Sequence, residues 1–186
     1  MVYVIVGASA SGINAAKTLR ENDKNAEIIL VSKDEYVYSR CILHHFLDGR
    51  REIEALDFTP KNFFEMYNIK WVKGVEVIGI DIKEKKLKLL NYEDLSYDKV
   101  LLAAGSSSFL PPIENLRTAN NVIGLRNLDD AIKIKEEARK VKNVAILGAG
   151  LVGVDALAGL LDYDVNITLI EMGDRILPLQ LDSYAA

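Results

Sequence analysis

Two glycine-containing turns, each placed between a short apolar segment and a helical pattern, constrain the fold of this chain most strongly. The first turn runs from Gly7 to Gly12 and the second from Gly148 to Gly153. Glycines at these positions permit a tight turn, a close approach of backbone to a pyrophosphate, and close packing of helix on strand. The free N–H groups of the helix N-terminus then favour an anion. We therefore predict two strand–turn–helix units that each hold a dinucleotide.

The second turn has the complete pattern, because glycines fill all three positions at Gly148, Gly150 and Gly153. The next apolar segment ends in Glu171, roughly 20 residues after the first glycine, where a carboxylate accepts hydrogen bonds from an adenosine ribose. A 2′-phosphate would meet a like charge there, so Glu171 favours NAD over NADP. Arg175 follows closely enough to moderate that preference. The alternative is a glycine turn of an α/β fold that binds no nucleotide.

The first turn departs from the pattern at two places. Ser9 replaces the middle glycine, and the following apolar segment ends in Ser32, where the second unit has an acid. Asp34 and Glu35 come only two and three positions later. A turn without a nucleotide is therefore a stronger alternative here than at the second turn.

Bulk composition narrows the classes of partner. A length of 186 residues allows one or two domains, and an apolar share of 49% is typical of a globular chain. The net charge of −4 argues against a nucleic-acid partner. No apolar run is long enough for a membrane span, the start lacks a secretory signal, and one cysteine forms no internal disulfide. We expect a cytoplasmic protein with no membrane partner.

The order of apolar patterns predicts an α/β fold of two Rossmann-like parallel-sheet units. An insertion in the first unit contains a helix and an antiparallel β-hairpin. A further strand and an exposed helix lead into the second unit. The predicted parallel strands are 2–6, 27–31, 99–103, 144–147 and 165–170. The insertion contains the helix 60–67, a strand at 69–72 and the hairpin strands 75–82 and 87–92, and the lead-in strand and helix are 121–125 and 129–141.

Four segments together resemble the FAD-dependent pyridine nucleotide–disulfide reductase superfamily. They are the turn at 7–12, residues 36–49, residues 97–106 with Ala104 where threonine is usual, and residues 148–171 with Asp155 where glutamate is frequent. The resemblance is greatest to the N-terminal half of the FAD/NAD(P)H domain of nitrite reductases, rubredoxin reductases, NADH oxidases and coenzyme A-disulfide reductases. It covers the whole chain.

The resemblance implies that FAD is held by the first unit and NADH by the second. Hydride would pass from NADH to FAD and then to a small-molecule or electron-carrier-protein acceptor that the sequence does not identify. In the first unit and its flavin-side segment the candidate cofactor-binding residues are Gly7, Ala8, Ser9, Ser11, Gly12, Ser32, Lys33, Arg40, Ala104 and Gly105. In the second unit they are Gly148, Gly150, Leu151, Val152, Gly153 and Glu171.

Cys41 has two interpretations. In NADH oxidases and coenzyme A-disulfide reductases a single redox cysteine lies beside the flavin in this segment, and Arg40 would stabilise its thiolate. Alternatively, Cys41 is a small apolar residue, because the surrounding sequence also matches reductases that need no cysteine. The adjacent His44 and His45 diverge by about 100° on a helix, so we expect no metal site.

Members of this superfamily are roughly twice as long as this chain. We therefore expect both units to be incomplete, with residues 1–108 forming the N-terminal part of an FAD-binding domain and 109–186 that of an NAD(P)-binding domain. Unpaired sheet edges would then favour self-association. The alternative to an active oxidoreductase is a truncated nucleotide-binding or self-associating fragment with no turnover of its own.

Overall fold

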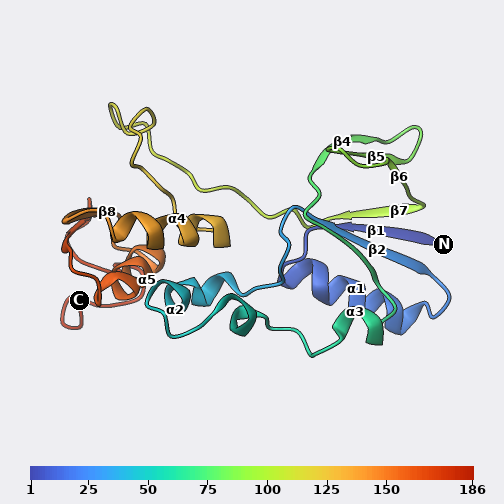
Figure 1. Cartoon of the computed structure of the whole chain (residues 1–186), viewed down its shortest axis with the longest axis horizontal. Helices are drawn as coiled ribbons and strands as arrows, with labels where there is room; N and C mark the ends of the chain where they lie inside the picture. The colour runs from blue at the N-terminus through green and yellow to red at the C-terminus, as the bar shows by residue number, and fades with distance from the viewer. The chain divides into compact units, whose positions relative to one another are not determined.

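The computed structural model describes residues 1–186, which form two compact units (Figure 1). The first unit consists of residues 1–39 and 57–106, and the second of residues 40–56 and 107–186. Both are α/β units built on a parallel sheet, as the sequence predicts. No helix combines the length and the apolar composition that crossing a bilayer requires.

A four-stranded parallel sheet forms the centre of the first unit. Its strand order is β3-β2-β1-β7. The strands are β1 (Val2–Val6), β2 (Glu27–Ser32), β3 (Lys70–Lys73) and β7 (Lys99–Leu102). Val4 in β1 lies opposite Ile29 in β2 and Val100 in β7, so β1 has a neighbour on both sides.

The two faces of this sheet are covered by different layers, because successive strand residues point to opposite faces. Ile5, Ile28 and Leu30 pack in one buried cluster with residues of α1 (Ala10–Asn22) and α3 (Phe63–Met66). Val4, Val6, Ile29 and Val31 pack in the other with residues of a small antiparallel sheet. That sheet has the order β4-β5-β6, with β4 (Val77–Asp81), β5 (Lys86–Leu89) and β6 (Leu95–Ser96). The predicted hairpin is therefore present, and β6 extends it.

The buried cation Arg20 lies in the last turn of α1 and joins this helix to the chain after α3. Arg20 is 8% exposed. Its guanidinium donates to the carbonyl oxygens of Asp23, Lys24, Tyr67 and Asn68 at 2.8 to 3.2 Å. Carbonyls at a helix end lack partners within the helix, so Arg20 stabilises both the helix terminus and the inserted segment.

In the second unit, β8 (Asn143–Leu147) pairs in parallel with β9 (Asn166–Ile170), and α5 (Leu151–Leu160) connects them. The helix α4 (Leu128–Ala138) precedes this βαβ motif. The carboxylate of Asp130 accepts hydrogen bonds from the backbone N–H groups of Arg126 and Asn127, at 3.0 and 2.9 Å, which fixes the start of α4.

Residues 40–56 are helical and belong to the second unit by their contacts. They comprise the short 3₁₀ segments η1 (Arg40–Ile42) and η2 (Ile53–Leu56), with α2 (Leu43–Leu47) between them. α2 packs on α4 and α5. The two compact units are therefore not contiguous in sequence, unlike the expected domains 1–108 and 109–186, and the division into cofactor domains stays a prediction.

Two predicted elements differ from the structure. Residues 121–125 form no strand, because the segment has no strand beside it to pair with. The helix predicted over 60–67 is limited to Phe63–Met66, since Asn62 takes a left-handed conformation with a φ of 60° and blocks an earlier start.

Candidate functional site

The two glycine turns have the same backbone geometry although they lie in different units. The first glycine of each has a positive φ, +110° at Gly7 and +99° at Gly148. A β-carbon on Gly12 would lie 1.8 Å from the Gly7 carbonyl oxygen, and one on Gly153 would lie 1.9 Å from that of Gly148. These distances exclude a side chain at the third position, and the positive φ disfavours one at the first position, so the backbone favours glycine at both outer positions of each turn.

The middle position of the turn is different, because it tolerates a side chain. Ser9 and Gly150 are the N-caps of α1 and α5, with φ values of −94° and −76° that any residue adopts. A β-carbon on Gly150 would meet nothing within 4 Å. Ser9 makes no side-chain bond to its helix. The replacement of the middle glycine by Ser9 is therefore compatible with the turn and leaves the first-turn N–H groups to a ligand.

Each turn is tied to the strand next to it by the same hydrogen bond. Gly7 N–H donates to the Val31 carbonyl at the end of β2, and Gly148 N–H donates to the Ile170 carbonyl at the end of β9, both at 2.8 Å. The turns therefore lie where the carboxyl ends of two parallel strands meet. In α/β sheets this is the edge at which ligands bind.

The predicted residues Ala104 and Gly105 lie beside the first turn. The N–H of Ala103, at the end of β7, donates to the Val6 carbonyl at 2.8 Å. A β-carbon on Gly7 would lie 2.3 Å from the Ala103 carbonyl oxygen. Ala104 and Gly105 follow directly and are exposed. The structure thus brings these two sequence-distant candidates to one edge of the sheet.

The other candidates of the first unit have mixed surroundings. Ala8 is buried, whereas Ser11 is exposed at the start of α1 and Lys33 is exposed after β2. Ser32 is 5% exposed. Its hydroxyl donates a hydrogen bond to the Asp34 carbonyl at 2.8 Å and accepts one from the Trp71 indole N–H at 3.0 Å. Ser32 is therefore engaged by the protein itself.

Glu171 lies against the second turn. Its two carboxylate oxygens accept hydrogen bonds from the backbone N–H of Ala149 at 2.6 Å and of Gly173 at 2.8 Å. The bond from Ala149, followed by that from Gly173, lowers the pKa of Glu171 below its ordinary value of 4.5. An anionic carboxylate thus lies beside the glycine turn, and its role toward a ribose stays a prediction. Leu151 and Val152, on the first turn of α5, are 59% and 56% exposed.

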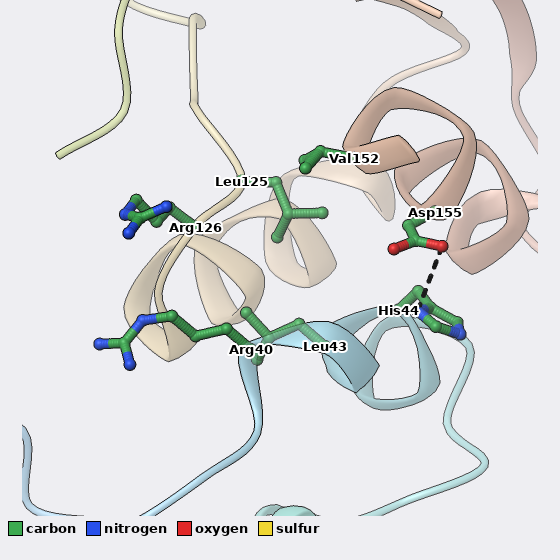
Figure 2. Close-up of a pocket in the computed structure, with 7 residues that line it drawn as sticks. All are labelled: Arg40, Leu43, His44, Leu125, Arg126, Val152 and Asp155. Carbon is green, nitrogen blue, oxygen red and sulfur yellow. Dashed lines mark ion pairs between the residues drawn. The ribbon is translucent and has the colours of Figure 1, made fainter. Parts of the chain in front are cut away.

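A cavity of about 80 Å³ lies in the second unit beside the start of α5 (Figure 2). It is lined by residues 40, 43 and 44 of the helical segment, 125 and 126 before α4, and 152 and 155 of α5. Figure 2 shows the guanidinium groups of Arg40 and Arg126 on one side and the His44–Asp155 ion pair on the other. Arg40, a cofactor candidate, therefore shares a cavity with Val152, another candidate.

Cys41 is exposed in η1, directly after Arg40. The two neighbouring histidines have different partners. His44 Nδ1 lies 3.6 Å from Asp155 Oδ1, and His45 Nδ1 lies 3.5 Å from Asp48 Oδ2. The described residues contain no group of three potential ligands that could hold a metal ion.

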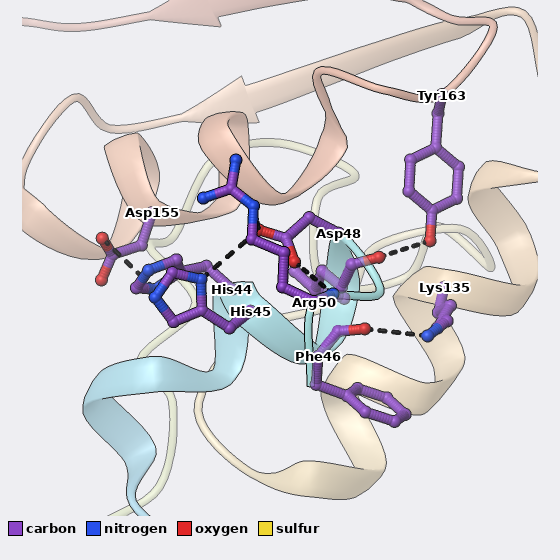
Figure 3. A network of polar contacts seen from close by, with 9 residues as sticks. His44, His45, Phe46, Asp48, Arg50, Lys135, Asp155 and Tyr163 are labelled. Carbon is purple, nitrogen blue, oxygen red and sulfur yellow. Dashed lines mark hydrogen bonds and ion pairs between the residues drawn. The ribbon is translucent and has the colours of Figure 1, made fainter. Parts of the chain in front are cut away.

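The end of α2 is fixed by donors from α4 and from the chain after α5, which the sequence does not reveal (Figure 3). Lys135 Nζ donates to the Phe46 carbonyl at 2.9 Å and lies 4.3 Å from the centre of its ring. Tyr163 donates its hydroxyl to the Leu47 carbonyl at 2.7 Å. A β-carbon on Gly159 would lie 2.8 Å from that of Leu47, so α5 approaches α2 closely only because it has glycine there.

Asp48 completes this end of α2. Its side chain is 2% exposed, and its carboxylate accepts from the Arg50 backbone N–H at 2.8 Å and pairs with His45 and with Arg50 Nε. Burial raises the pKa of Asp48, but the Arg50 N–H, the His45 hydrogen bond and the nearby positive charges outweigh burial, so the pKa is lowered overall. Asp48 is therefore an anion at neutral pH.

Comparison with known proteins gives consistent matches over the whole chain. Residues 1–186 match the family model described as pyridine nucleotide-disulphide oxidoreductase. An NADH oxidase from Methanocaldococcus jannaschii is 31% identical, with 98% of this chain and 42% of that protein aligned. The rubredoxin-NAD(+) reductase of Alcanivorax borkumensis is 32% identical, with 98% of this chain and 48% of that protein aligned.

Solved structures give the same fold. The NAD-dependent persulfide reductase from A. fulgidus superposes with a TM-score of 0.87 at 29% identity, covering 100% of this chain and 37% of that one. The chain therefore spans less than half the length of each of these three proteins.

Proposed function

Because the chain belongs to the pyridine nucleotide-disulphide oxidoreductase family, we propose that it forms the cofactor-binding half of an oxidoreductase that oxidises NADH. FAD and NADH are the cofactors of this family. The observation that carries the proposal is the pair of matching glycine turns, each at the carboxyl edge of a parallel sheet, with Glu171 bonded to the second.

The second turn fits NADH. The first-turn N–H groups of α5 and the open space at Gly150 suit a pyrophosphate. Glu171 is oriented by the Ala149 N–H and would accept the hydroxyls of the adenosine ribose, while its charge disfavours the 2′-phosphate of NADPH. The residues fit the group, and the bound cofactors supply the hydride chemistry, whereas the protein binds, orients and tunes them.

The first turn fits the pyrophosphate of FAD by the same geometry. Gly7 and Gly12 shape the turn, Ser9 occupies the tolerant middle position, and Ala104 and Gly105 lie at the same edge of the sheet. Arg40, which the resemblance assigns to the flavin nucleotide, belongs to the second unit and lines a cavity with Val152, so its role toward a cofactor stays a prediction. The Ser32 hydroxyl is the weakest candidate for binding FAD, since it already forms hydrogen bonds with Trp71 and Asp34.

We propose an electron-carrier protein or a small molecule as the final acceptor. One relative is named a rubredoxin-NAD(+) reductase, and a structural neighbour at 25% identity is a reductase in covalent complex with putidaredoxin. Both names favour a small redox protein. An NADH oxidase is equally similar in sequence, so oxygen is the competing acceptor.

A thiol function for Cys41 is the second candidate. Its exposure in η1 favours it, because a reactive cysteine must be accessible to its substrate. The similarity to a persulfide reductase supports a sulfur-containing substrate. Cys41→Ser should then abolish turnover of a disulfide or persulfide and leave FAD and NADH binding intact.

The alternative is a nucleotide-binding fragment with no turnover of its own, which associates through its open sheet edge. Leu101 and Leu102 of the edge strand β7 are 43% and 63% exposed. A molar mass in solution above that of a monomer, lost on Leu102→Lys, would support this alternative. A monomer that retains FAD would count against it.

Flavin retention and nucleotide titration test the proposal. Purified chain should retain flavin absorbance after gel filtration, and NADH should bind more tightly than NADPH. Glu171→Ala should weaken NADH more than NADPH, because it removes the ribose acceptor and the charge that repels a 2′-phosphate. Equal weakening of both nucleotides would overturn the ribose assignment, and a colourless protein would favour the fragment alternative.

A further inference from the structure

The side chain of Glu171 occupies a group of backbone donors beside the second glycine turn. Its Oε2 accepts a hydrogen bond from the Ala149 N–H at 2.6 Å, and its Oε1 accepts one from the Gly173 N–H at 2.8 Å. The Ala149 N–H lowers the pKa of Glu171 most, followed by that of Gly173 and, less strongly, that of Met172. Backbone N–H groups that converge in this way form a nest, which binds anions. Glu171 is therefore the chain's own ligand of an N–H nest made by residues 149, 172 and 173.

The N–H nest is held in place by bonds that do not involve the Glu171 side chain. The Leu177 N–H donates to the Ala149 carbonyl at 2.9 Å, so the segment after β9 returns to the glycine turn. The Gly148 N–H donates to the Ile170 carbonyl at 2.8 Å and joins the same turn to the end of β9. Because these bonds lie on both sides of Glu171 in the sequence, we expect the nest to keep its shape when the carboxylate is removed.

The position of the N–H nest suits a phosphate on the adenosine ribose. In the proposed NADH site the Glu171 carboxylate accepts the ribose hydroxyls. A phosphate on the 2′-oxygen would then compete for the place that this carboxylate occupies. Phosphate oxygens accept hydrogen bonds from backbone N–H groups as carboxylate oxygens do, so the donors that hold Glu171 suit either anion.

One cation follows the N–H nest closely in the sequence. Arg175 is the only lysine or arginine among residues 143–186, and its side chain is 32% exposed. Its Nη1 lies 3.2 Å from both carboxylate oxygens of Asp174, and its Nη2 lies 3.5 Å from the Pro178 carbonyl oxygen. Asp174 offsets part of the positive charge, so the backbone N–H groups are the principal anion donors and Arg175 is a secondary one.

We propose that the N–H nest is a latent phosphate site, which Glu171 fills in this chain and which accepts the 2′-phosphate of NADPH once Glu171 is shortened. The inference rests on the proposed NADH site. Glu171 accordingly disfavours NADPH in two ways. Its charge repels the phosphate, and its carboxylate occupies the donors that would otherwise bind the phosphate.

Two neutral substitutions separate these effects, because charge repulsion alone would treat them alike. Glu171→Gln removes the charge but leaves an amide oxygen beside the N–H groups, whereas Glu171→Ala also empties the nest. Glu171→Ala should therefore bind NADPH about tenfold more tightly than Glu171→Gln, the equivalent of one hydrogen bond to a charged group. Equal dissociation constants of NADPH for the two variants would overturn the proposal.

Arg175→Met, introduced into the Glu171→Ala chain, tests the contribution of the cation. We expect it to reduce the gain in NADPH affinity only in part, because the backbone donors remain. A gain that Arg175→Met abolishes completely would assign the phosphate to Arg175 and overturn the nest.

A second measurement uses inorganic phosphate and needs no nucleotide. In Glu171→Ala, phosphate should shift the amide NMR signals of Ala149 and Gly173 in a saturable way, and the parent chain should show no such shifts. The Gly148 N–H is the matched control and should move least, since the Ile170 carbonyl already accepts it. Glu171→Ser also empties the nest and should respond as Glu171→Ala does. Shifts confined to the first turn of α5 would overturn the latent site.

The two measurements distinguish this inference from the proposed function. Phosphate binding at Ala149 and Gly173 of Glu171→Ala, without NADH binding to the parent chain, would support the nest and contradict the proposed function. NADH binding to the parent chain, with no response of either amide to phosphate in Glu171→Ala, would overturn the nest and leave the proposed function standing.

Discussion

Gly153 packs so closely on Gly148 that a β-carbon at the first residue would lie 1.9 Å from the carbonyl oxygen of the second. The obstacle is backbone, which cannot move aside as a flexible side chain can. The same relationship joins Gly12 to Gly7 at 1.8 Å. In both units the helix therefore starts close to the end of the strand only because the third position of the turn is glycine.

Gly153→Ala should destabilise the second unit by about 1–3 kcal/mol, since overpacking outweighs the better helix propensity of alanine. Gly150→Ala is the matched control, because a β-carbon there meets nothing within 4 Å and the φ of −76° suits alanine. Urea unfolding should separate the two variants, while NADH titration should show weakened binding for both. Equal unfolding midpoints for the two would contradict the steric argument.

Sequence patterns predicted the two turns and their strands because glycine spacing and apolar runs are local signals. Ser9 departs from the glycine pattern, and its φ of −94°, which any residue adopts, explains why it is compatible with the turn. The position of residues 40–56 could not be predicted in this way. It depends on Lys135, Tyr163 and Gly159, which lie far along the chain and have no periodic pattern relating them to α2.

The strand predicted at 121–125 is absent from the structure. An apolar segment becomes a strand only where a neighbouring strand accepts its hydrogen bonds, and the sequence of the segment itself does not contain that information. The pairing of His44 with Asp155 is equally non-local, because it needs α2 and α5 to pack first.

Arg20→Met should destabilise the chain by about 3 kcal/mol, because it leaves carbonyls at the end of α1 and after α3 without their charged donor. Lys17→Met on the same helix is the control. Lys17 forms an exposed pair with Glu21 at 3.9 Å, and such pairs contribute about 0.5 kcal/mol or less. Thermal unfolding measures both, and a similar loss for the two variants would argue against a special role for Arg20.

Tyr163→Phe should destabilise the second unit by about 1 kcal/mol, since the Leu47 carbonyl loses its donor at the end of α2. Tyr184→Phe, at a tyrosine that is 98% exposed, should have no effect on unfolding. If residues 40–56 depend on this bond, Tyr163→Phe should also increase hydrogen exchange in α2 more than in β8. Unchanged exchange in α2 would show that Lys135 and Gly159 suffice to hold it.

Glu171→Gln should reduce stability at neutral pH and lose its effect in acid. The Ala149 N–H, followed by that of Gly173, lowers the pKa of Glu171 in the folded chain, so folding favours the anion. A lowered pKa contributes stability that is present above the ordinary value of 4.5 and is lost as the pH falls through the folded value. Urea midpoints of the parent and Glu171→Gln should therefore differ at neutral pH and converge in acid. Asp174→Asn, three positions beyond Glu171 and exposed, is the control. A difference that persists undiminished in acid would mean that the carboxylate charge does not support the glycine turn.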